Sequence, residues 1–543
     1  MPHNTKYIFI SGGVLSGLGK GTVSASLCYL LKSHGYKVVP VKCENYLNID
    51  AGLINPIEHG DPFLCEDGAE TDMDLGTYER FLDMNLSMEN FITMGQIYKD
   101  VIDKERNFFY KGEDVEAIPH VTDEIIQRIK AVGEKSHADI VVIELGGTAG
   151  EYQNALYYEA SRIMKFKFGD TVVHIHVSYL PTPPHLGEPK TKPTQLSVKL
   201  LNSMGIQPDF LVARADRIID SRRMERFALF CNVIPEHIIS SPDVPNIYEL
   251  PIIFAKQKFS QKILAQLNLP LTPLKIQPWE KLIQLIKAPK KQTVNIAIVG
   301  KYFATGDYHL TDSYASLIEA IHHAGWYNQV NINIKQINSE KIVGQAEKIL
   351  SDCQGIIVPI GWGPRGVDGM IEAIKYSREN KIPYLGLCFG MQLAVVEFAR
   401  NVANLAGANT TEVNSKTKYP VVYIIPEQKR NVKLRAYGGT MRLGAWECRL
   451  QPGTLAYKIY QHSDIFERHR HRYEFNDAYT DRLTKAGLVI SGRSVKENLV
   501  EMIELSEPDH PFFIATQGHP EYKSRPLNPH PVFLEFVKAT KKL

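Results

Sequence analysis

The chemistry of this chain is concentrated in short stretches that follow apolar segments typical of buried strands. The first stretch, SGGVLSGLGKGTVSAS at residues 11–26, has four glycines ahead of Lys20. Glycines allow backbone conformations with positive φ that turn several N–H groups toward one point. A helix that begins near Gly21 would add the positive end of its dipole, and Lys20 would add a full charge. We therefore expect a loop that binds a triphosphate.

The loop departs from a regular Walker A motif, because Gly21 stands where Ser or Thr would follow the lysine and Thr22 comes one residue later. Carboxylates elsewhere would then hold Mg²⁺, which prefers oxygen ligands. Residues 66–76, EDGAETDMDLG, supply five carboxylates, although a solvated acidic loop is the usual explanation of such a run. Glu144 ends an apolar strand and is followed by two glycines. Asp74 and Glu144 are our candidate metal ligands.

The second reactive stretch is LGLCFGMQ, residues 385–392, in which an expected strand runs directly into Cys388 and then into an apolar helix. This pattern predicts a nucleophile elbow that exposes the sulfur at a helix N-terminus, where the thiolate is favoured. His519 could act as the base, and Glu521 could orient its imidazole. The backbone amides of Gly361 and Phe389 are candidate donors to an oxyanion.

Two basic stretches have alternative interpretations. In GEPKTKPTQ, residues 187–195, two lysines lie in a loop stiffened by prolines, which suits a second polyphosphate as well as it suits solvated surface lysines. ERHRHR, residues 467–472, could contact nucleic acid or metal, but the near-neutral chain favours a local site for an anion or carboxylate. Arg472 could bind an amino-acid carboxylate with two hydrogen bonds.

The composition indicates a water-soluble chain of two or more domains that acts on small molecules. The chain has 543 residues, a net charge of +2 and 44% hydrophobic residues. No apolar run approaches the ~18 residues that span a bilayer, and the first residues lack the features of a signal peptide. The seven cysteines are widely spaced without a CxxC pair, which favours a reducing compartment. We expect a cytoplasmic location.

The elements that must position these residues alternate between strand and helix. In the N-terminal half, strands are expected at 7–10, 37–42, 139–144, 171–177 and 210–214, with a helix at 23–33. Such alternation predicts a mainly parallel sheet covered on both faces, with ligands at the carboxyl ends of the strands. The charged residues Lys42, Glu144 and Arg214 stand at those ends.

Residues 267–293 are rich in proline and lysine and read as a connector with one short helix at 279–287. A second alternation begins at Val294, with a helix near 313–323 and strands at 330–336, 355–359 and 383–387. The expected fold class is α/β, with domains at 1–267 and 294–543 joined by a linker at 268–293.

The chain resembles the CTP synthase family from end to end. The motifs that carry the resemblance are GGVLSGLGKG, EDGAETDMDLG, GGTAG, KTKPTQ, ALFCNV, GLCFGMQ, GGTMRLG, ERHRHRYE and GHPE. The resemblance implies an N-terminal P-loop-like synthetase domain with a parallel sheet, joined to a class I glutamine amidotransferase domain. ATP would phosphorylate the 4-oxygen of UTP, and ammonia from glutamine would displace the phosphate. It also implies Mg²⁺, GTP as activator, CTP as feedback inhibitor, a homotetramer and, as a further option, filaments.

The resemblance also assigns residues to ligands. The residues implied for ATP are Gly17, Leu18, Gly19, Lys20, Gly21, Thr22, Asp74 and Val244, with Asp74 and Glu144 on the metal. Those implied for UTP or CTP are Ser16, Glu151, Tyr152, Gln153, Lys190, Thr191, Lys192, Pro193, Thr194, Gln195 and Arg226. The catalytic residues would be Cys388, His519 and Glu521. Glutamine would contact Gly361, Phe389, Gly390, Met391, Gln392, Glu412 and Arg472.

Several positions depart from the family pattern. Residues 42–46 read KCENY where Lys-Leu-Asp-Pro-Tyr is usual, and Glu151 and Gln153 replace Asp and Glu. Arg226 replaces a lysine, Ile360 replaces a glycine beside the expected oxyanion site, and Gly518 replaces an aromatic residue. Nucleotide affinity and feedback are the properties that these changes would alter.

Two rival functions stay open on the sequence. One is an ATP-dependent amidotransferase with a different acceptor, as in cobyrinic-acid diamide synthases, which share the two-domain plan; KTKPTQ argues against it. The other is a filament-forming or regulatory nucleotide-binding protein whose synthesis activity has decayed. A complete set of Cys388, His519 and Glu521 favours an active enzyme.

Overall fold

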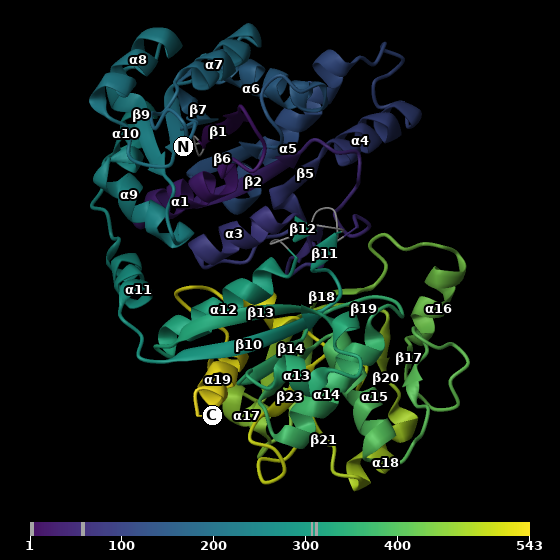
Figure 1. Cartoon of the computed structure of the whole chain (residues 1–543). Helices are drawn as coiled ribbons and strands as arrows, with labels where there is room; N and C mark the ends of the chain where they lie inside the picture. The colour runs from purple at the N-terminus through teal and green to yellow at the C-terminus, as the bar shows by residue number, and fades with distance from the viewer. Residues whose placement is uncertain (1–4, 56–59, 306–307, 310–312, 543) are drawn as a thin grey trace. The chain divides into compact units, whose positions relative to one another are not determined.

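The computed structural model describes residues 5–55, 60–305, 308–309 and 313–542. The chain forms two compact units, which are coloured by sequence position in Figure 1. Unit 1 contains residues 1–49 and 74–283, and unit 2 contains residues 50–73 and 284–543.

Unit 1 is built on a seven-stranded sheet in which every described pairing is parallel. Residues 7–13 of its central strand are all buried, so both faces of the sheet are covered. The strands in spatial order are β5 (Phe91–Thr93), β2 (Val38–Glu44), β6 (Ile140–Leu145), β1 (Lys6–Gly13), β7 (Val172–Tyr179), β8 (Phe210–Ala215) and β9 (Ile238–Pro242).

The helices of unit 1 surround this sheet (Figure 1). They are α1 (Lys20–Ser33), α3 (Met73–Leu82), α4 (Met94–Arg106), α5 (Thr122–Ser136), α6 (Ala155–Phe168), α7 (Lys192–Ser203), α8 (Ser221–Cys231), α9 (Leu250–Lys256) and α10 (Phe259–Gln266). Helix α11 (Gln277–Lys287) follows and crosses the boundary between the units at residues 283 and 284.

Unit 2 contains a nine-stranded mixed sheet. Its first five strands in spatial order pair in parallel, and the remaining pairings are antiparallel. The strands in spatial order are β13 (Asn331–Asn338), β10 (Thr293–Gly300), β14 (Gly355–Val358), β15 (Tyr384–Leu387), β23 (Phe513–Thr516), β22 (Val500–Glu504), β21 (Val489–Ser494), β18 (Arg442–Leu450) and β19 (Asp464–His471).

Helices and short strands complete unit 2. The helices are α12 (Ala315–Tyr327), α13 (Ala346–Leu350), α14 (Val367–Asn380), α15 (Phe389–Asn401), α16 (Pro426–Lys433), α17 (Leu455–Tyr460), α18 (Thr480–Lys485) and α19 (Pro531–Thr540). The short strands are β3 (Phe63–Leu64), β4 (Glu70–Thr71), β11 (Ala304–Thr305), β12 (Tyr308–His309), β16 (Asn409–Thr410), β17 (Pro420–Ile424) and β20 (Tyr473–Phe475).

The expected α/β class and the expected strands are confirmed, with ends that shift by a few residues. Strands β5 and β9 were not predicted, because each is short and lies at an edge of the parallel sheet. ERHRHR forms most of β19, a buried strand rather than an exposed basic run. The alternative explanation of residues 66–76 as a solvated acidic loop describes only part of the segment, because the hairpin strand β4 and the start of α3 fall within it.

Residues 50–73 belong to unit 2 although unit 1 flanks them in the sequence. Arg468 Nε lies 2.8 Å from Glu66 Oε2, and Arg470 Nε lies 2.7 Å from Glu70 Oε1. The Tyr522 hydroxyl donates to the Pro62 carbonyl over 3.1 Å. One buried ion pair, Arg470–Glu70, and one partly exposed pair, Arg468–Glu66, therefore hold the segment against β19.

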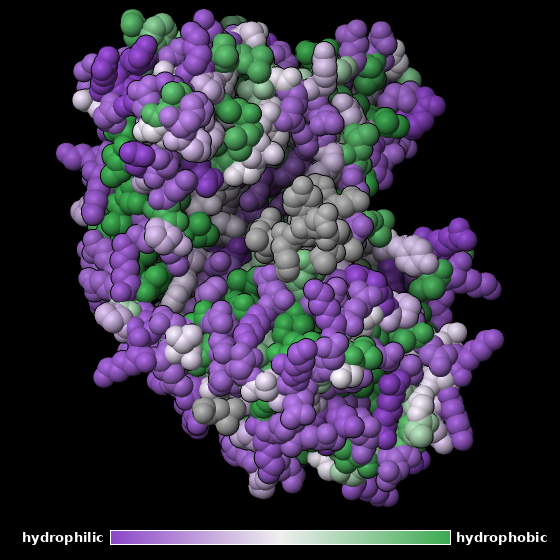
Figure 2. All heavy atoms as spheres, in the orientation of Figure 1, coloured by the Kyte–Doolittle hydropathy of each residue, from purple (hydrophilic) through white to green (hydrophobic). Residues whose placement is uncertain are grey.

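Hydrophilic residues cover most of the visible surface, with smaller hydrophobic patches among them (Figure 2). No helix in the described part of the chain is long and apolar enough to cross a membrane. All seven cysteines are buried and free of disulfides.

Candidate active sites

The glycine-rich loop connects β1 to α1 in unit 1. Gly17 and Gly19 have φ values of 68° and 88°, in the left-handed region that favours glycine. Lys20 begins α1, and its Nζ donates to the Gly147 carbonyl over 2.6 Å. Burial lowers the pKa of Lys20, while Glu144 acts in the opposite direction. The loop thus places a helix N-terminus and an ammonium group together, as an anion site requires.

Lys42 lies at the carboxyl end of β2 and contacts three carboxylates. Its Nζ is 2.8 Å from Glu144 Oε1 and 3.2 Å from Glu44 Oε1, and it also pairs with Asp74. Burial alone would lower the pKa of Lys42, but the three carboxylates raise it well above its usual value. Burial raises the pKa of Glu144. The two predicted metal ligands are therefore brought together.

The presence of glycine rather than Ser or Thr at position 21 has a steric explanation. A Cβ added there would lie 2.4 Å from Asp74 Oδ1 and 3.6 Å from Glu144 Oε2. The carboxylates thus lie against the first turn of α1, where the Ser or Thr of a regular Walker A motif would not fit. Among the described residues no group of three His, Cys, Asp or Glu could hold a metal ion. Two carboxylates beside a phosphate loop still suit Mg²⁺, which takes other ligands from phosphate and water.

Next to this loop lies a cavity of about 240 Å³, with Leu18, Gly19 and Thr22 on one side and Val244 on the other. Arg214 also lines it and donates to the Gly17 carbonyl over 3.3 Å. The position of Val244 is compatible with the role that the family resemblance implies for it.

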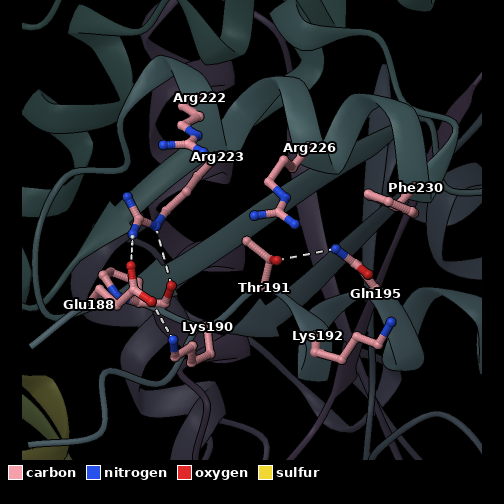
Figure 3. Close-up of a pocket in the computed structure, with 10 residues that line it drawn as sticks. Glu188, Lys190, Thr191, Lys192, Gln195, Arg222, Arg223, Arg226 and Phe230 are labelled. Atoms are coloured by element: carbon pink, nitrogen blue, oxygen red, sulfur yellow. Dashed lines mark hydrogen bonds and ion pairs between the residues drawn. The ribbon is translucent and has the colours of Figure 1, made fainter. Parts of the chain in front are cut away.

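A second cavity of unit 1, of about 490 Å³, gathers the basic residues of GEPKTKPTQ with those of α8 (Figure 3). Arg226 extends into it from α8, while Lys190 pairs with Glu188. Arg223 also pairs with Glu188, over 3.6 Å. The other residues around the cavity are Pro189, Thr191, Lys192, Gln195, Arg222 and Phe230. The lysines thus lie in an anion-attracting pocket with three arginines.

The residues expected to bind UTP or CTP that do not line this cavity differ in their exposure and contacts. Pro193 and Thr194 lie in the first turn of α7, and the Thr194 hydroxyl donates to the Tyr179 carbonyl over 2.9 Å. Glu151 turns toward its own loop and accepts from the Thr148 amide over 2.8 Å. Ser16, Tyr152 and Gln153 are exposed, Tyr152 at 99%.

In unit 2, Cys388 connects β15 to α15 with φ 51° and ψ −99°, a strained conformation for a non-glycine residue. His519 Nδ1 lies 2.7 Å from Glu521 Oε1. Burial acts to lower the pKa of His519, but Glu521 and Cys388 raise it to about 10. The predicted Cys-His-Glu arrangement is therefore present in one unit, with the imidazole within electrostatic range of the sulfur.

The loop at 360–363 carries the candidate oxyanion donor Gly361. The Gly363 amide donates to Glu412 over 2.8 Å, and Lys301 Nζ donates to the Trp362 and Gly363 carbonyls over 3.1 and 2.5 Å. The same Nζ lies 4.4 Å from the centre of the Phe389 ring. Within the part of the chain that the structure describes, neither Gly361 nor Phe389 uses its amide in a backbone hydrogen bond.

The other residues expected to bind glutamine lie on several elements of unit 2. Gly390, Met391 and Gln392 are buried in the first turn of α15. Gln392 Nε2 donates to the Tyr473 carbonyl over 2.9 Å. Arg472 donates to Gln428 over 2.5 Å and to the Tyr437 carbonyl over 2.7 Å. Its guanidinium is thus fixed by protein groups in this structure.

The sequence alone gave no role to three residues of unit 2. Lys301 contacts the loop that carries Gly361, and Arg468 and Arg470 pair with Glu66 and Glu70. Lys301 follows β10 with no motif of its own, and Arg468 and Arg470 lie in ERHRHR, for which only Arg472 was given a role. The alternation of ERHRHR with period two was the available signal, since it places the arginines on one face of a strand.

The comparisons with known proteins agree with this geometry. The family model described as "CTP synthase N-terminus" matches residues 6–269, and that described as "Glutamine amidotransferase class-I" matches residues 309–539. A CTP synthase of Caldanaerobacter subterraneus subsp. tengcongensis is 50% identical over 536 residues, 98% of each chain. The chain belongs to the CTP synthase family. CTP synthases of Sulfolobus acidocaldarius and Thermus thermophilus are 49% and 45% identical over 98% and 99% of this chain and 99% and 97% of theirs.

As a member of the CTP synthase family, the chain is a glutamine-hydrolysing ligase, with the two-part α/β architecture expected of one. Its departures from the family pattern have local explanations. Asn45 Nδ2 donates to Glu151 Oε2 over 3.3 Å, so two departures contact each other. A Cβ at Gly518 would lie 2.8 Å from Glu467 Cβ, which leaves no room for an aromatic residue. Ile360 is buried in the core.

Proposed function

We propose that this chain converts UTP to CTP with ATP and the amide nitrogen of glutamine, using the residues described above. The observation that supports the proposal is that one member of the family carries both groups of predicted residues, one in each unit. Unit 1 has a phosphate loop beside Lys42, Asp74 and Glu144. Unit 2 has a strained cysteine beside a histidine–glutamate pair.

In the synthetase half, Gly17 to Thr22 and Val244 bind ATP, and Lys20 contacts its phosphates. Asp74 and Glu144 would hold Mg²⁺, which when bound would supply neutralisation of phosphate charge. Lys190 to Gln195, Arg226 and Ser16 with residues 151–153 bind UTP or inhibitory CTP. The 4-oxygen of UTP attacks the γ-phosphorus, the N3 proton of the uracil ring is lost, and ADP leaves. Ammonia then attacks C4, loses a proton, and inorganic phosphate leaves.

In the glutaminase half, His519 carries the proton of the Cys388 thiol as an imidazolium, in line with its raised pKa, and Glu521 stabilises that cation. The thiolate attacks the amide carbon, and the Gly361 and Phe389 amides donate to the oxyanion. His519 returns the proton to the departing ammonia, and water hydrolyses the thioester to glutamate. Gly390, Met391, Gln392, Glu412 and Arg472 position the glutamine.

Family membership also supports regulation and assembly. GTP would activate glutamine hydrolysis, CTP would inhibit synthesis, and the enzyme would form tetramers and, under some conditions, filaments. The seven free cysteines support a cytoplasmic location. The functional division would be a synthetase domain at 1–267, a linker at 268–293 and an amidotransferase domain at 294–543, with residues 50–73 held by the latter.

The test is chromatographic detection of CTP from UTP, ATP and Mg²⁺, with glutamine and with ammonium in parallel. CTP from both nitrogen sources is the expected result. CTP from ammonium alone would mean that the changes at Ile360 and Gly518 have disabled the glutaminase. Glutamine hydrolysis without CTP from either source would contradict UTP as the acceptor.

A further inference from the structure

A buried histidine that has no assigned role lies between the two nucleotide regions of unit 1. His176 is in β7, beside β1 in the sheet (Figure 1), and is fully buried. Its Nδ1 lies 2.8 Å from Ser11 Oγ, and its Nε2 lies 2.6 Å from Ser197 Oγ. Ser11 and Ser197 are also buried, at 3% and 7% exposure. The three side chains form one continuous hydrogen-bonded chain, here called the Ser11–His176–Ser197 relay.

The two ends of the relay belong to different ligand regions. Ser11 is in β1, directly before the glycines of the phosphate loop. Ser197 is in α7, two residues after Gln195 and in the helix whose first turn contains Lys192 and Thr194. The relay therefore joins the element that leads into the proposed ATP site to the element that carries the proposed UTP site.

The hydrogen-bond directions follow from the neighbours. Burial, and next the Lys20 charge, lower the pKa of His176 to about 3, so the ring is neutral and carries one N–H. Ser11 Oγ also lies 3.3 Å from the Ile175 carbonyl, which can only accept. If Ser11 donates to that carbonyl, Nδ1–H donates to Ser11 and Ser197 donates to Nε2. This tautomer satisfies every member of the relay.

The packing around the relay leaves little room for adjustment. A Cβ at Gly13 would lie 1.7 Å from Ser197 Oγ and 2.8 Å from His176 Nε2. The phosphate loop thus begins in direct contact with α7 and with the imidazole. Thr194 makes a second link, from α7 to the end of β7. A shift of α7 would have to break the relay or move the loop.

We propose that His176 is a positioning residue that fixes the separation between the phosphate loop and α7, so that the γ-phosphate of ATP meets the 4-oxygen of UTP. The inference rests on the nucleotide placement proposed above. Phosphoryl transfer depends mainly on positioning and electrostatic stabilisation, and a misplacement of about 1 Å costs on the order of a hundredfold in rate. Each nucleotide keeps its own contacts without the relay, so its loss lowers kcat more than it raises either KM.

The decisive variant is Ser197→Ala, which removes one hydroxyl and keeps the Cβ that packs in the helix. We expect kcat of ammonium-dependent CTP synthesis to fall about tenfold or more, with the KM values for ATP and UTP within about threefold. Ser203→Ala is the matched control on the same helix, since its hydroxyl bonds only to the Leu200 carbonyl among the described residues. A wild-type kcat in Ser197→Ala, or equal effects in the two variants, would overturn the proposal.

Variants of the ring give a second test. His176→Gln can place an acceptor near the Nε2 position, so it should retain more kcat than His176→Leu. His174→Leu changes an equally buried histidine of the same strand that stacks on Phe9, and it should lower stability without the kcat effect. Equal kcat losses in His174→Leu and His176→Leu would reduce the relay to core packing and overturn the proposal.

The proposed nucleotide sites can be refuted independently of the relay. If Lys20→Ala still makes CTP from ammonium, the proposed ATP site is wrong and the inference falls with it. If Lys20→Ala is inactive while Ser197→Ala has wild-type kcat, only the relay is refuted. Thermal melting of each variant identifies losses of activity that come from unfolding.

Discussion

The site in unit 1 and the site in unit 2 both follow a parallel strand, but they use that position differently. In unit 1 two strand ends and the first turn of α3 supply a group of charges, with Lys42 against Glu44, Asp74 and Glu144. In unit 2 one residue, Cys388, takes a strained conformation at the start of a helix, and a single histidine–carboxylate pair supports it. A phosphate site distributes its binding over many donors, whereas a nucleophile depends on one atom.

The largest expected effect comes from the nucleophile. Cys388→Ala should reduce glutamine-dependent synthesis by about 10⁴-fold or more, because no other group can form the thioester. Ammonium-dependent synthesis should remain, since unit 1 is unchanged. Parallel CTP assays with both nitrogen sources make the measurement. Loss of both activities in a folded variant would contradict the separation of the two sites.

Lys20→Ala is the complementary variant. It removes a charge next to the phosphates, and both activities should fall by on the order of a hundredfold or more, because either nitrogen source needs the phosphorylated intermediate. Basal glutamine hydrolysis, which uses only unit 2, should continue. A selective loss of the glutamine-dependent reaction would show that the loop has another role.

A stability measurement tests whether Lys42 is the centre of its cluster. Lys42→Met leaves the buried Glu144 and the partly exposed Glu44 and Asp74 without their cation, and breaking a buried pair such as Lys42–Glu144 costs about 3–5 kcal/mol. Lys99→Met removes the exposed Lys99–Asp103 pair and should cost far less, because solvent screens such a pair. Urea unfolding of both variants against the wild type gives the difference. Similar costs would mean that the cluster does not depend on Lys42.

The arrangement of Cys388, His519 and Glu521 predicts that the stability of the protein depends on pH. The pKa of His519 is raised to about 10, above the unfolded value near 6.5. The stabilisation from its proton is therefore complete below pH ~6.5 and is lost as pH rises toward about 10. Glu521→Gln removes an attraction that raises this pKa, so the variant should lose less stability between pH 7 and 9.5 than the wild type. Equal losses in urea unfolding would refute the charged pair.

The sequence predicted the parts of these sites that depend on local chemistry. The glycine loop, the elbow at Cys388 and the strand that ends at Glu144 each need only a short stretch with a distinctive pattern. It did not predict that Arg468 and Arg470 pair with Glu66 and Glu70, about 400 residues earlier. Nor did it predict the relay at His176. Such pairs arise from tertiary packing, and no spacing within one element indicates them.

The smallest expected effect concerns the departures at Asn45 and Glu151. Their hydrogen bond is long, at 3.3 Å, and Glu151 also accepts from the Thr148 amide and hydroxyl. Asn45→Ala should therefore cost about 0.5–1 kcal/mol and change the KM for UTP by less than about fivefold. In the Asn45→Ala variant Glu151 keeps its bonds to Thr148, whereas Glu151→Gln changes the carboxylate that accepts them. Glu151→Gln should therefore have the larger effect of the two. Steady-state kinetics with varied UTP measure which variant has the larger effect. A larger effect of Asn45→Ala would mean that the Asn45–Glu151 hydrogen bond, rather than the bonds from Thr148 to Glu151, holds the nucleotide loop. The double variant should then be less costly than the sum of the single changes, because both remove the same hydrogen bond.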